Sequence, residues 1–200
     1  MAQNNPFQQQ FQELRDKASS KDTVKSYQWY MTQIRQLGLA TPKPANVLKS
    51  DIGELVTTVR WGDMYLFLYD PKTKAKLKYY DRFPLVVPFR VIRGGFLGLN
   101  LHYLPPLLRD RLLTRLMKLA DDPHLSATTR LRFTWNIIKN AARYPEVAPC
   151  VKRYLVPNVR SRFLKIHPTD WRSSIMLPTE TFIGDTKQNV YRNSQDIINA

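Results

Sequence analysis

Hydrophobic residues recur at helical spacing near the start of the chain. Phe7, Phe11 and Leu14 share one face behind Pro6, a residue that is tolerated in the first turn of a helix. After a break at Ser19-Ser20, a second helical stripe consists of Val24, Tyr27, Met31, Ile34 and Leu37. Gly38 then stands where helices commonly end. We therefore predict two helices within residues 6–38, the Gln-rich first one peripheral, and a Pro-containing linker at residues 41–44.

From about Leu55 to Leu104 the hydrophobic spacing changes to that of strands. A turn signal at residues 70–74 separates an apolar run from a segment of alternating charged and apolar residues, which predicts a returning strand. Pro84 and Pro88 cannot donate ladder hydrogen bonds and indicate an edge strand or a bent one. Gly98 indicates a bulge or close packing. The predicted strands of this antiparallel sheet are residues 64–69, 76–81, 83–92 and 96–104.

Helical spacing returns in the second half of the chain. The predicted helices are residues 105–120, 126–143, 150–155 and 187–198, with a strand or extended segment at 159–166. The fold class is thus α+β: an N-terminal helical arm, a small antiparallel β-sheet or partly open barrel, and a helical C-terminal half. We divide the chain into residues 1–50 (arm and linker) and 51–200 (core domain with a C-terminal amphipathic helix). That last helix can dock on its own core or on a neighbouring subunit.

The charge balance of the chain indicates what kind of partner the protein binds. The chain carries 31 Lys and Arg against 16 Asp and Glu, a net charge of +15, and most of the excess lies in residues 72–93 and 125–165. So basic a balance favours a polyanionic partner, above all nucleic acid. A single cysteine excludes a disulfide framework and a Cys-based zinc site. No apolar run approaches the roughly 20 residues of a membrane helix, and the first residues do not form a signal peptide, so we expect no membrane partner.

Both basic blocks also carry aromatic residues. Cations neutralise phosphates and rings stack on unpaired bases, although the same aromatics can instead belong to the core. Arg160 and Arg162 fall on one face of an extended segment and would form a ridge for phosphates, which suit the planar fork of arginine. The candidate DNA-binding or partner-binding residues are Lys72, Lys74, Lys76, Lys78, Arg130, Arg132, Lys152, Arg153, Arg160, Arg162 and Lys165.

Catalytic chemistry has little support in the sequence. The histidines at positions 102, 124 and 167 lack metal-ligand spacing, and we interpret them and Cys150 as structural. The best enzymatic alternative is a metal-dependent nuclease that uses Asp63, Asp70 and Asp81, with a lysine at 72, 74 or 76 as the cation. We expect no cofactor, no small-molecule substrate and no catalytic residue.

Several strings of the chain resemble a known protein family. These are Met64–Lys72, Tyr79–Leu85, Gly95–Pro105, Thr128–Arg132, Pro149–Leu155, Val159–Phe163 and Leu177–Glu180. They are similar to small basic virion and morphogenesis proteins of large contractile-tailed bacteriophages, which include DNA end protectors. The resemblance covers roughly residues 60–190 and is poor over the first 50.

The resemblance implies a virion protein, made in the host cytoplasm, that contacts the packaged end of double-stranded DNA near the portal and neck. Other virion proteins of the portal, neck, tail or baseplate would be its partners. Such binding would be phosphate neutralisation without sequence specificity. The alternative is a structural tail, neck or baseplate component whose basic face binds acidic neighbouring subunits.

Overall fold

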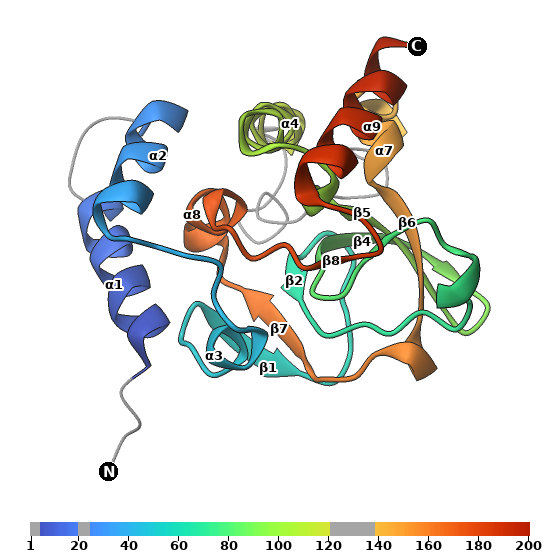
Figure 1. The fold of residues 1–200 in the computed structure, drawn as a ribbon, viewed down its shortest axis with the longest axis horizontal. Coiled ribbons are helices and arrows are strands. Elements are labelled where there is room, and N and C mark those ends of the chain that lie inside the picture. Colours follow the sequence, from blue (N-terminus) through green and yellow to red (C-terminus); the bar gives the residue numbers. More distant parts are fainter. Residues whose placement is uncertain (1–4, 20–24, 121–138) are drawn as a thin grey trace.

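The computed structural model describes residues 5–19, 25–120 and 139–200 (Figure 1). Its centre is an antiparallel six-stranded sheet in the order β1-β7-β2-β4-β5-β6, which stays open. Its strands are β1 (Gly53–Val56), β2 (Tyr65–Leu66), β4 (Leu85–Ile92), β5 (Gly95–Asn100), β6 (Val151–Leu155) and β7 (Phe163–Ile166). A separate two-stranded sheet pairs β3 (Tyr80–Asp81) with β8 (Phe182–Ile183). The protein is α+β, as the sequence predicts.

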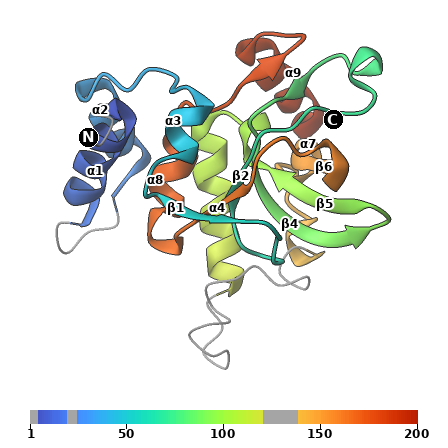
Figure 2. The ribbon, with the colours of Figure 1, turned by 90° about the horizontal axis from the view of Figure 1, so that it is seen from below.

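The helices gather on one face of the large sheet and at one of its ends. They are α1 (Pro6–Ser19), α2 (Tyr27–Gln36), α3 (Pro44–Leu48), α4 (Pro106–Ala120), α7 (Val147–Cys150), α8 (Trp171–Met176) and α9 (Lys187–Asn199). Short 3₁₀ turns are η1 (Lys74–Lys76), η2 (Leu101–Tyr103), η3 (Val156–Asn158) and η4 (Pro168–Asp170). Figure 1 shows α4 end-on above the strands, Figure 2 shows it behind them, and both views place α1 beside α2 at the far end.

The first helix is less peripheral than its glutamines suggest. Phe7, Phe11 and Leu14 are buried in the main hydrophobic core, which corrects that expectation. Three apolar residues about one turn apart give a helix one face that packs into the core, whichever residues the opposite face carries. Arg15 also forms a bidentate contact with Asp170, with Nη2 2.9 Å from Oδ2. The division of the chain after residue 50 stays a prediction.

The predicted hairpin between residues 64–69 and 76–81 is wrong. Residues 74–76 form η1, and Tyr80-Asp81 pairs with β8 instead. The neighbours of β2 are β4 and β7, so that Leu66 lies opposite both Leu85 and Leu164. The physical reason is burial: β2 is covered on both faces, whereas the lysine-rich segment 72–78 is exposed and cannot enter that position.

The segment predicted as a helix at 150–155 is also different. Only Cys150 belongs to α7, and Val151–Leu155 form β6, which pairs with β5. The exposed Arg153 alternates with the buried Tyr154, which is strand periodicity in a run too short to reveal it beforehand. The extended segment at 159–166 becomes a strand only from Phe163. The helix predicted at 126–143 lies mostly outside the described residues.

Pro88 bends β4 inside the sheet and does not mark an edge. The register with β5 shifts between Pro88 and Arg90, and β4 lies between β2 and β5. Gly98 stands opposite Pro88, and a Cβ added to it would collide with Cγ1 of Val86. The close packing inferred from the sequence at Gly98 is therefore present, and the bulge belongs to β4.

The two faces of the sheet carry different cores. The larger core, under the helices, contains Leu66 and Leu164. The other is mostly aromatic and consists of Tyr65, Phe67, Tyr69, Val86, Phe96, Tyr154 and Phe163. Tyr154 and Phe163, two aromatic residues of the second basic block, are thus core residues.

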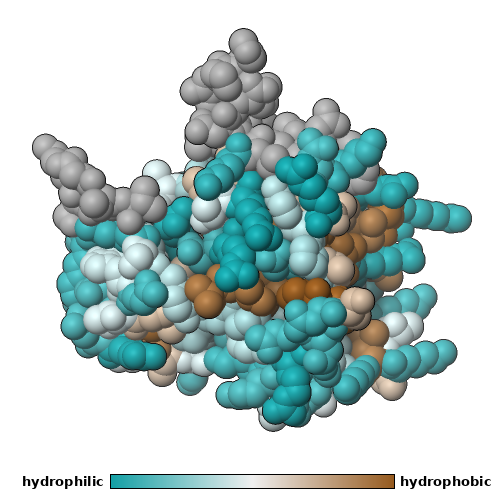
Figure 3. Space-filling model, turned by 90° about the horizontal axis from the view of Figure 1, so that it is seen from above, coloured by the Kyte–Doolittle hydropathy of each residue, from teal (hydrophilic) through white to brown (hydrophobic). Residues whose placement is uncertain are grey.

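The C-terminal helix docks on its own chain, where α9 buries Val190 and Ser194 against α7 and η2. In the described part of the chain no helix is long and apolar enough to cross a bilayer. Hydrophobic side chains form only a narrow band on the side that carries α2, α4 and α9 (Figure 3). Hydrophilic side chains project at the edge where Figure 1 places β4, β5 and β6.

Candidate nucleic-acid interface

A pocket of about 620 Å³ opens beside β6, between that strand and residues 71–81. We call it the tyrosine pocket because five tyrosines line it: Tyr69, Tyr79, Tyr80, Tyr103 and Tyr154. Small-ligand sites in proteins commonly have volumes of about 300–1,000 Å³. The pocket is thus large enough to admit a ligand, and its walls come from segments far apart in the sequence.

Four cations also line the tyrosine pocket: Lys72, Lys78, Lys152 and Arg153. Two come from each basic block of the sequence. None forms an ion pair with a carboxylate among the residues that the structure describes, although Lys78 lies near enough to Asp185 to help lower the pKa of that carboxylate. Asp81 is the one acidic residue among the described lining residues, and both of its oxygens already accept hydrogen bonds from the chain. The pocket therefore has a surplus of positive charge.

Lys152 is the least exposed of these four cations. Its Nζ lies 4.0 Å from the centroid of the Tyr103 ring, a cation–π contact. Burial lowers the pKa of Lys152 below the usual lysine value, because the ammonium has lost part of its hydration. An anion in the pocket would offset that cost directly.

The tyrosines differ in how much of each ring is accessible. Tyr69, Tyr103 and Tyr154 are nearly buried, and the rings of Tyr69 and Tyr154 meet edge to face at 4.9 Å. Tyr79 and Tyr80 are half-buried, and the Tyr79 ring lies 6.0 Å from that of Tyr103. The first three form a fixed aromatic floor, and the last two offer accessible faces.

A second, smaller hollow of about 280 Å³ adjoins the first through Tyr69 and Tyr80. Its basic lining residues are Lys74, Arg82 and Arg160, gathered around Asp70. Lys74 is ion-paired with Asp70 at 3.0 Å, and Arg160 lies 3.9 Å from the same carboxylate. These two cations are therefore partly neutralised within the chain.

The structure distributes the remaining candidate cations more widely. Lys165 is ion-paired with the buried Asp63 at 3.0 Å. Lys76 and Arg162 are exposed and line neither hollow. The strand expected to carry Arg160 and Arg162 begins only at Phe163, so these two exposed residues precede β7 and their role as a phosphate ridge stays a prediction. Arg130 and Arg132 lie outside the described residues.

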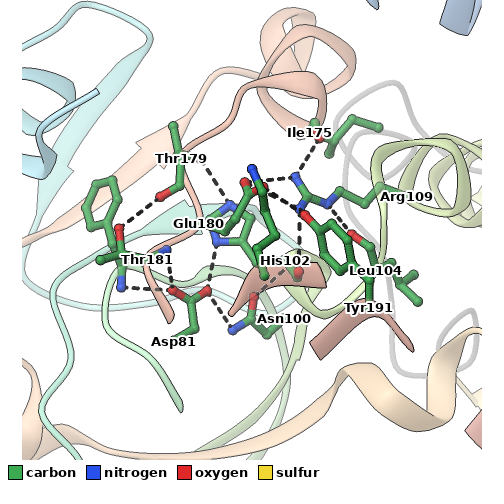
Figure 4. A network of polar contacts seen from close by, with 12 residues as sticks. Asp81, Asn100, His102, Leu104, Arg109, Ile175, Thr179, Glu180, Thr181 and Tyr191 are labelled. Atoms are coloured by element: carbon green, nitrogen blue, oxygen red, sulfur yellow. Dashed lines mark hydrogen bonds and ion pairs between the residues drawn. The ribbon is translucent and has the colours of Figure 1, made fainter. Parts of the chain in front are cut away.

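A buried polar network supports the wall behind the pocket (Figure 4). His102 contacts Asp81 through Nδ1 at 2.8 Å and the Thr179 hydroxyl through Nε2 at 3.0 Å. The order hydroxyl, imidazole, carboxylate is that of a nucleophilic triad. However, Thr179 is 1% exposed and His102 fully buried, so no substrate reaches the hydroxyl. The contacts tie β3 and η2 to the segment before β8.

Arg109 continues this network and was missed by the sequence analysis. It is fully buried, and its Nη2 donates to the Tyr191 hydroxyl at 2.6 Å and lies 3.4 Å from Glu180. The helical spacing of the sequence could have revealed its burial, because position 109 shares one face with the leucines at 112, 113 and 116.

Glu180 is the matching buried anion of this network. Burial alone would raise its pKa, but the charges of Arg109, His102 and Lys187 outweigh that and hold the pKa well below the ordinary value. The Nζ of Lys187, at the start of α9, lies 3.1 Å from Oε1 of Glu180. The pair thus fastens the C-terminal helix to the core.

The residues proposed for nuclease chemistry do not converge. Asp63 pairs with Lys165, Asp70 with Lys74, and Asp81 with His102. Over residues 5–19, 25–120 and 139–200, no group of three possible metal ligands comes together. Cys150 is buried, its Sγ contacts the Glu146 carbonyl, and burial raises its thiol pKa to about 12, which keeps it protonated and unreactive.

Comparisons with known proteins place this geometry in context. A family model described as phage T4 terminal DNA protecting protein matches residues 2–198. Searches of curated proteins and of solved structures find no match. The match confirms the resemblance to phage DNA end protectors and extends it over the first 50 residues, where the sequence strings gave no indication. Because it spans nearly the whole chain, the chain belongs to the phage T4 terminal DNA protecting protein family.

Proposed function

We propose that the protein binds the ends of the packaged double-stranded genome, in the portal and neck region of the virion, and shields them without catalysing a reaction. The family description supports the choice of DNA ends. The observation that carries the choice of surface is the tyrosine pocket, where cations of both basic blocks meet without carboxylate partners among the described residues.

Charge explains why these cations favour DNA. A lysine or arginine that already has a carboxylate partner must give up that contact to bind phosphate, whereas Lys72, Lys78 and Arg153 have none to give up in the described chain. Each phosphate that they neutralise releases condensed counterions, so affinity falls steeply with salt. Such contacts position the duplex and do not read its sequence.

Shielding needs only that the terminal phosphodiesters be covered. An exonuclease must take the end of the strand into its own site, and a bound protein denies it that access. This function needs no reactive group, in keeping with the buried state of His102, Thr179 and Cys150.

The test compares linear and closed circular DNA of one sequence across a salt series with Mg²⁺ present, followed by an exonuclease challenge of the linear form. We expect tighter binding to linear DNA and slower digestion. A K152Q/R153Q double variant should lose most of this effect. K76Q/R162Q removes the same charge outside both hollows and should retain it.

Other outcomes would contradict the proposal. Equal affinity for linear and circular DNA would remove the preference for ends. No binding at low salt would assign the basic face to an acidic neighbouring subunit, and new DNA fragments that require Mg²⁺ would indicate a nuclease.

A further inference from the structure

The tyrosine pocket has two properties that a plain phosphate-binding surface does not need. It is a concave site of about 620 Å³, and five of its fourteen described lining residues are tyrosines. Duplex DNA hides its bases in the stack, so its uninterrupted backbone would meet only the rim cations. Only a nucleotide outside the stack can use a pocket of this depth and composition, since base–aromatic stacking requires a free base face.

We infer that the tyrosine pocket holds the 5′-phosphorylated terminal nucleotide of a DNA strand, with its base against Tyr79 and Tyr80 and its terminal phosphate at Lys152. This inference rests on the proposed function and names the groups, the terminal base and the terminal phosphate, by which the protein would distinguish a DNA end from the interior of a duplex.

The aromatic side of the site fits a base. Tyr79 and Tyr80 are half-buried, so part of each residue stays accessible, and Nζ of Lys78 lies 5.9 Å from the centroid of the Tyr79 ring. Tyr79 is held by contacts with Tyr103 at 6.0 Å and Phe182 at 6.4 Å between ring centroids. Rings fixed in this way lose little conformational freedom when a base stacks on them.

The cationic side of the site fits a terminal phosphate. An internal phosphodiester carries one negative charge, but a terminal phosphate monoester carries about −1.5 to −2 at neutral pH. Four cations without carboxylate partners in the described chain match a phosphate monoester and the next phosphodiester better than a single phosphodiester. Lys152 is half-buried against Tyr103, so its charge is less screened by water than that of a surface lysine.

The inner wall sets how far the nucleotide enters. Asp81 is 3% exposed and directs both oxygens to the chain, where Oδ2 lies 3.1 Å from Nδ2 of Asn100 and 2.8 Å from Nδ1 of His102. Its negative charge stays at the back of the pocket. A phosphate is therefore favoured beside the β6 cations, and the uncharged base faces the tyrosines.

The first measurement uses small probes on the full chain: thymidine 5′-monophosphate, thymidine and inorganic phosphate, titrated by calorimetry. We expect the nucleotide to bind at least tenfold more tightly than either fragment. K152Q should reduce nucleotide binding to the level of thymidine, and Y79A/Y80A to the level of phosphate. K49Q, at an exposed lysine outside the pocket, should bind like the wild type, and Y79F/Y80F, which keeps the rings, should rescue the aromatic loss.

The second measurement uses duplexes whose ends carry either a 5′-phosphate or a 5′-hydroxyl, with closed circular DNA as reference. We expect removal of the phosphate to weaken end binding about tenfold in the wild type and not in K152Q. If the wild type prefers ends equally with both termini, and K152Q and Y79A/Y80A leave nucleotide binding unchanged, the pocket assignment is overturned while the proposed function survives. If the nucleotide binds in the pocket but linear and circular DNA bind equally, the proposed function fails instead.

Discussion

The ammonium group of Lys152 lies 4.0 Å above the ring of Tyr103, at the edge of the tyrosine pocket. This contact joins a cation of the second basic block to a tyrosine that follows β5. The ring partly replaces the water that Lys152 loses, but burial still lowers the pKa of the lysine. Holding the ammonium of Lys152 in a partly buried place destabilises the folded protein. A binding site can contain such a charge because the bound anion compensates for that cost.

Lys152 should therefore lower the stability of the folded protein while it strengthens binding to DNA ends. We expect K152M, which keeps most of the apolar stem, to leave the melting temperature equal or higher and to weaken binding to DNA ends about tenfold. Because the folded-state pKa is below the unfolded value of 10.5, the wild type should gain stability relative to K152M as pH rises toward 10. Thermal melts at pH 7 and pH 10 measure both effects. A lower melting temperature for K152M at pH 7 would contradict this account.

Arg109 should contribute more to stability than any surface arginine of its helix. Removing it leaves Glu180 buried with only part of its compensation, so we expect R109M to lose about 3–5 kcal/mol of unfolding free energy. R111M changes the same residue type at an exposed position of α4 and should cost less than about 0.5 kcal/mol. Urea denaturation of the two variants is the measurement. Similar losses would show that the buried pair is not decisive.

Glu180 should be the main cause of the fall in unfolding free energy at acidic pH. Its pKa in the folded protein lies below the ordinary value of 4.5, so the unfolded chain takes up a proton first as the pH falls. The stabilisation from Glu180 is thus complete above pH 5 and is lost progressively below it. We expect the difference in unfolding free energy between wild type and E180Q to be largest above pH 5 and to shrink steadily as the pH falls from 5 toward 2. A constant difference across this range would exclude Glu180 as the source.

Replacing Asp70 should have opposite effects under the DNA-binding and the nuclease hypotheses. It neutralises Lys74 and Arg160, so D70N should free both cations and strengthen DNA binding several-fold at low salt. A metal-dependent nuclease would instead lose activity with D70N. Fluorescence anisotropy with a labelled duplex, with and without Mg²⁺, gives both answers, and D196N offers a control at an exposed carboxylate of α9. Weaker binding by D70N would contradict the role given to these cations.

Gly98 should tolerate no side chain while Val86 is present. The methyl group of G98A would collide with Cγ1 of Val86 across the β4–β5 pair, and overpacking of this kind costs about 1–3 kcal/mol. The double variant V86A/G98A removes the colliding methyl, so its loss should be smaller than the sum of the two single losses. Additive losses in a denaturation cycle would show that the contact is not the cause.

Local pattern alone identified the helices that begin at Pro6, Tyr27, Pro106 and Lys187, because three or four apolar residues at helical spacing suffice to define a buried face. It also gave the α+β class and the close packing at Gly98. It failed for residues 76–81 and 150–155. There the runs were short, and the outcome depended on which distant strand offered a partner, β8 in one case and β5 in the other.

The amino-acid sequence by itself determined that the protein is strongly basic, that its charge lies in two blocks, and that its cations outnumber the carboxylates able to neutralise them. Only the tertiary structure decided which cations remain available. Lys165 and Lys74 found carboxylates, whereas Lys152 and Lys72 met at one pocket. The reason is that ion pairing acts through space over a few ångströms, and the fold joins residues 72–78 to β6 across some seventy positions of the chain.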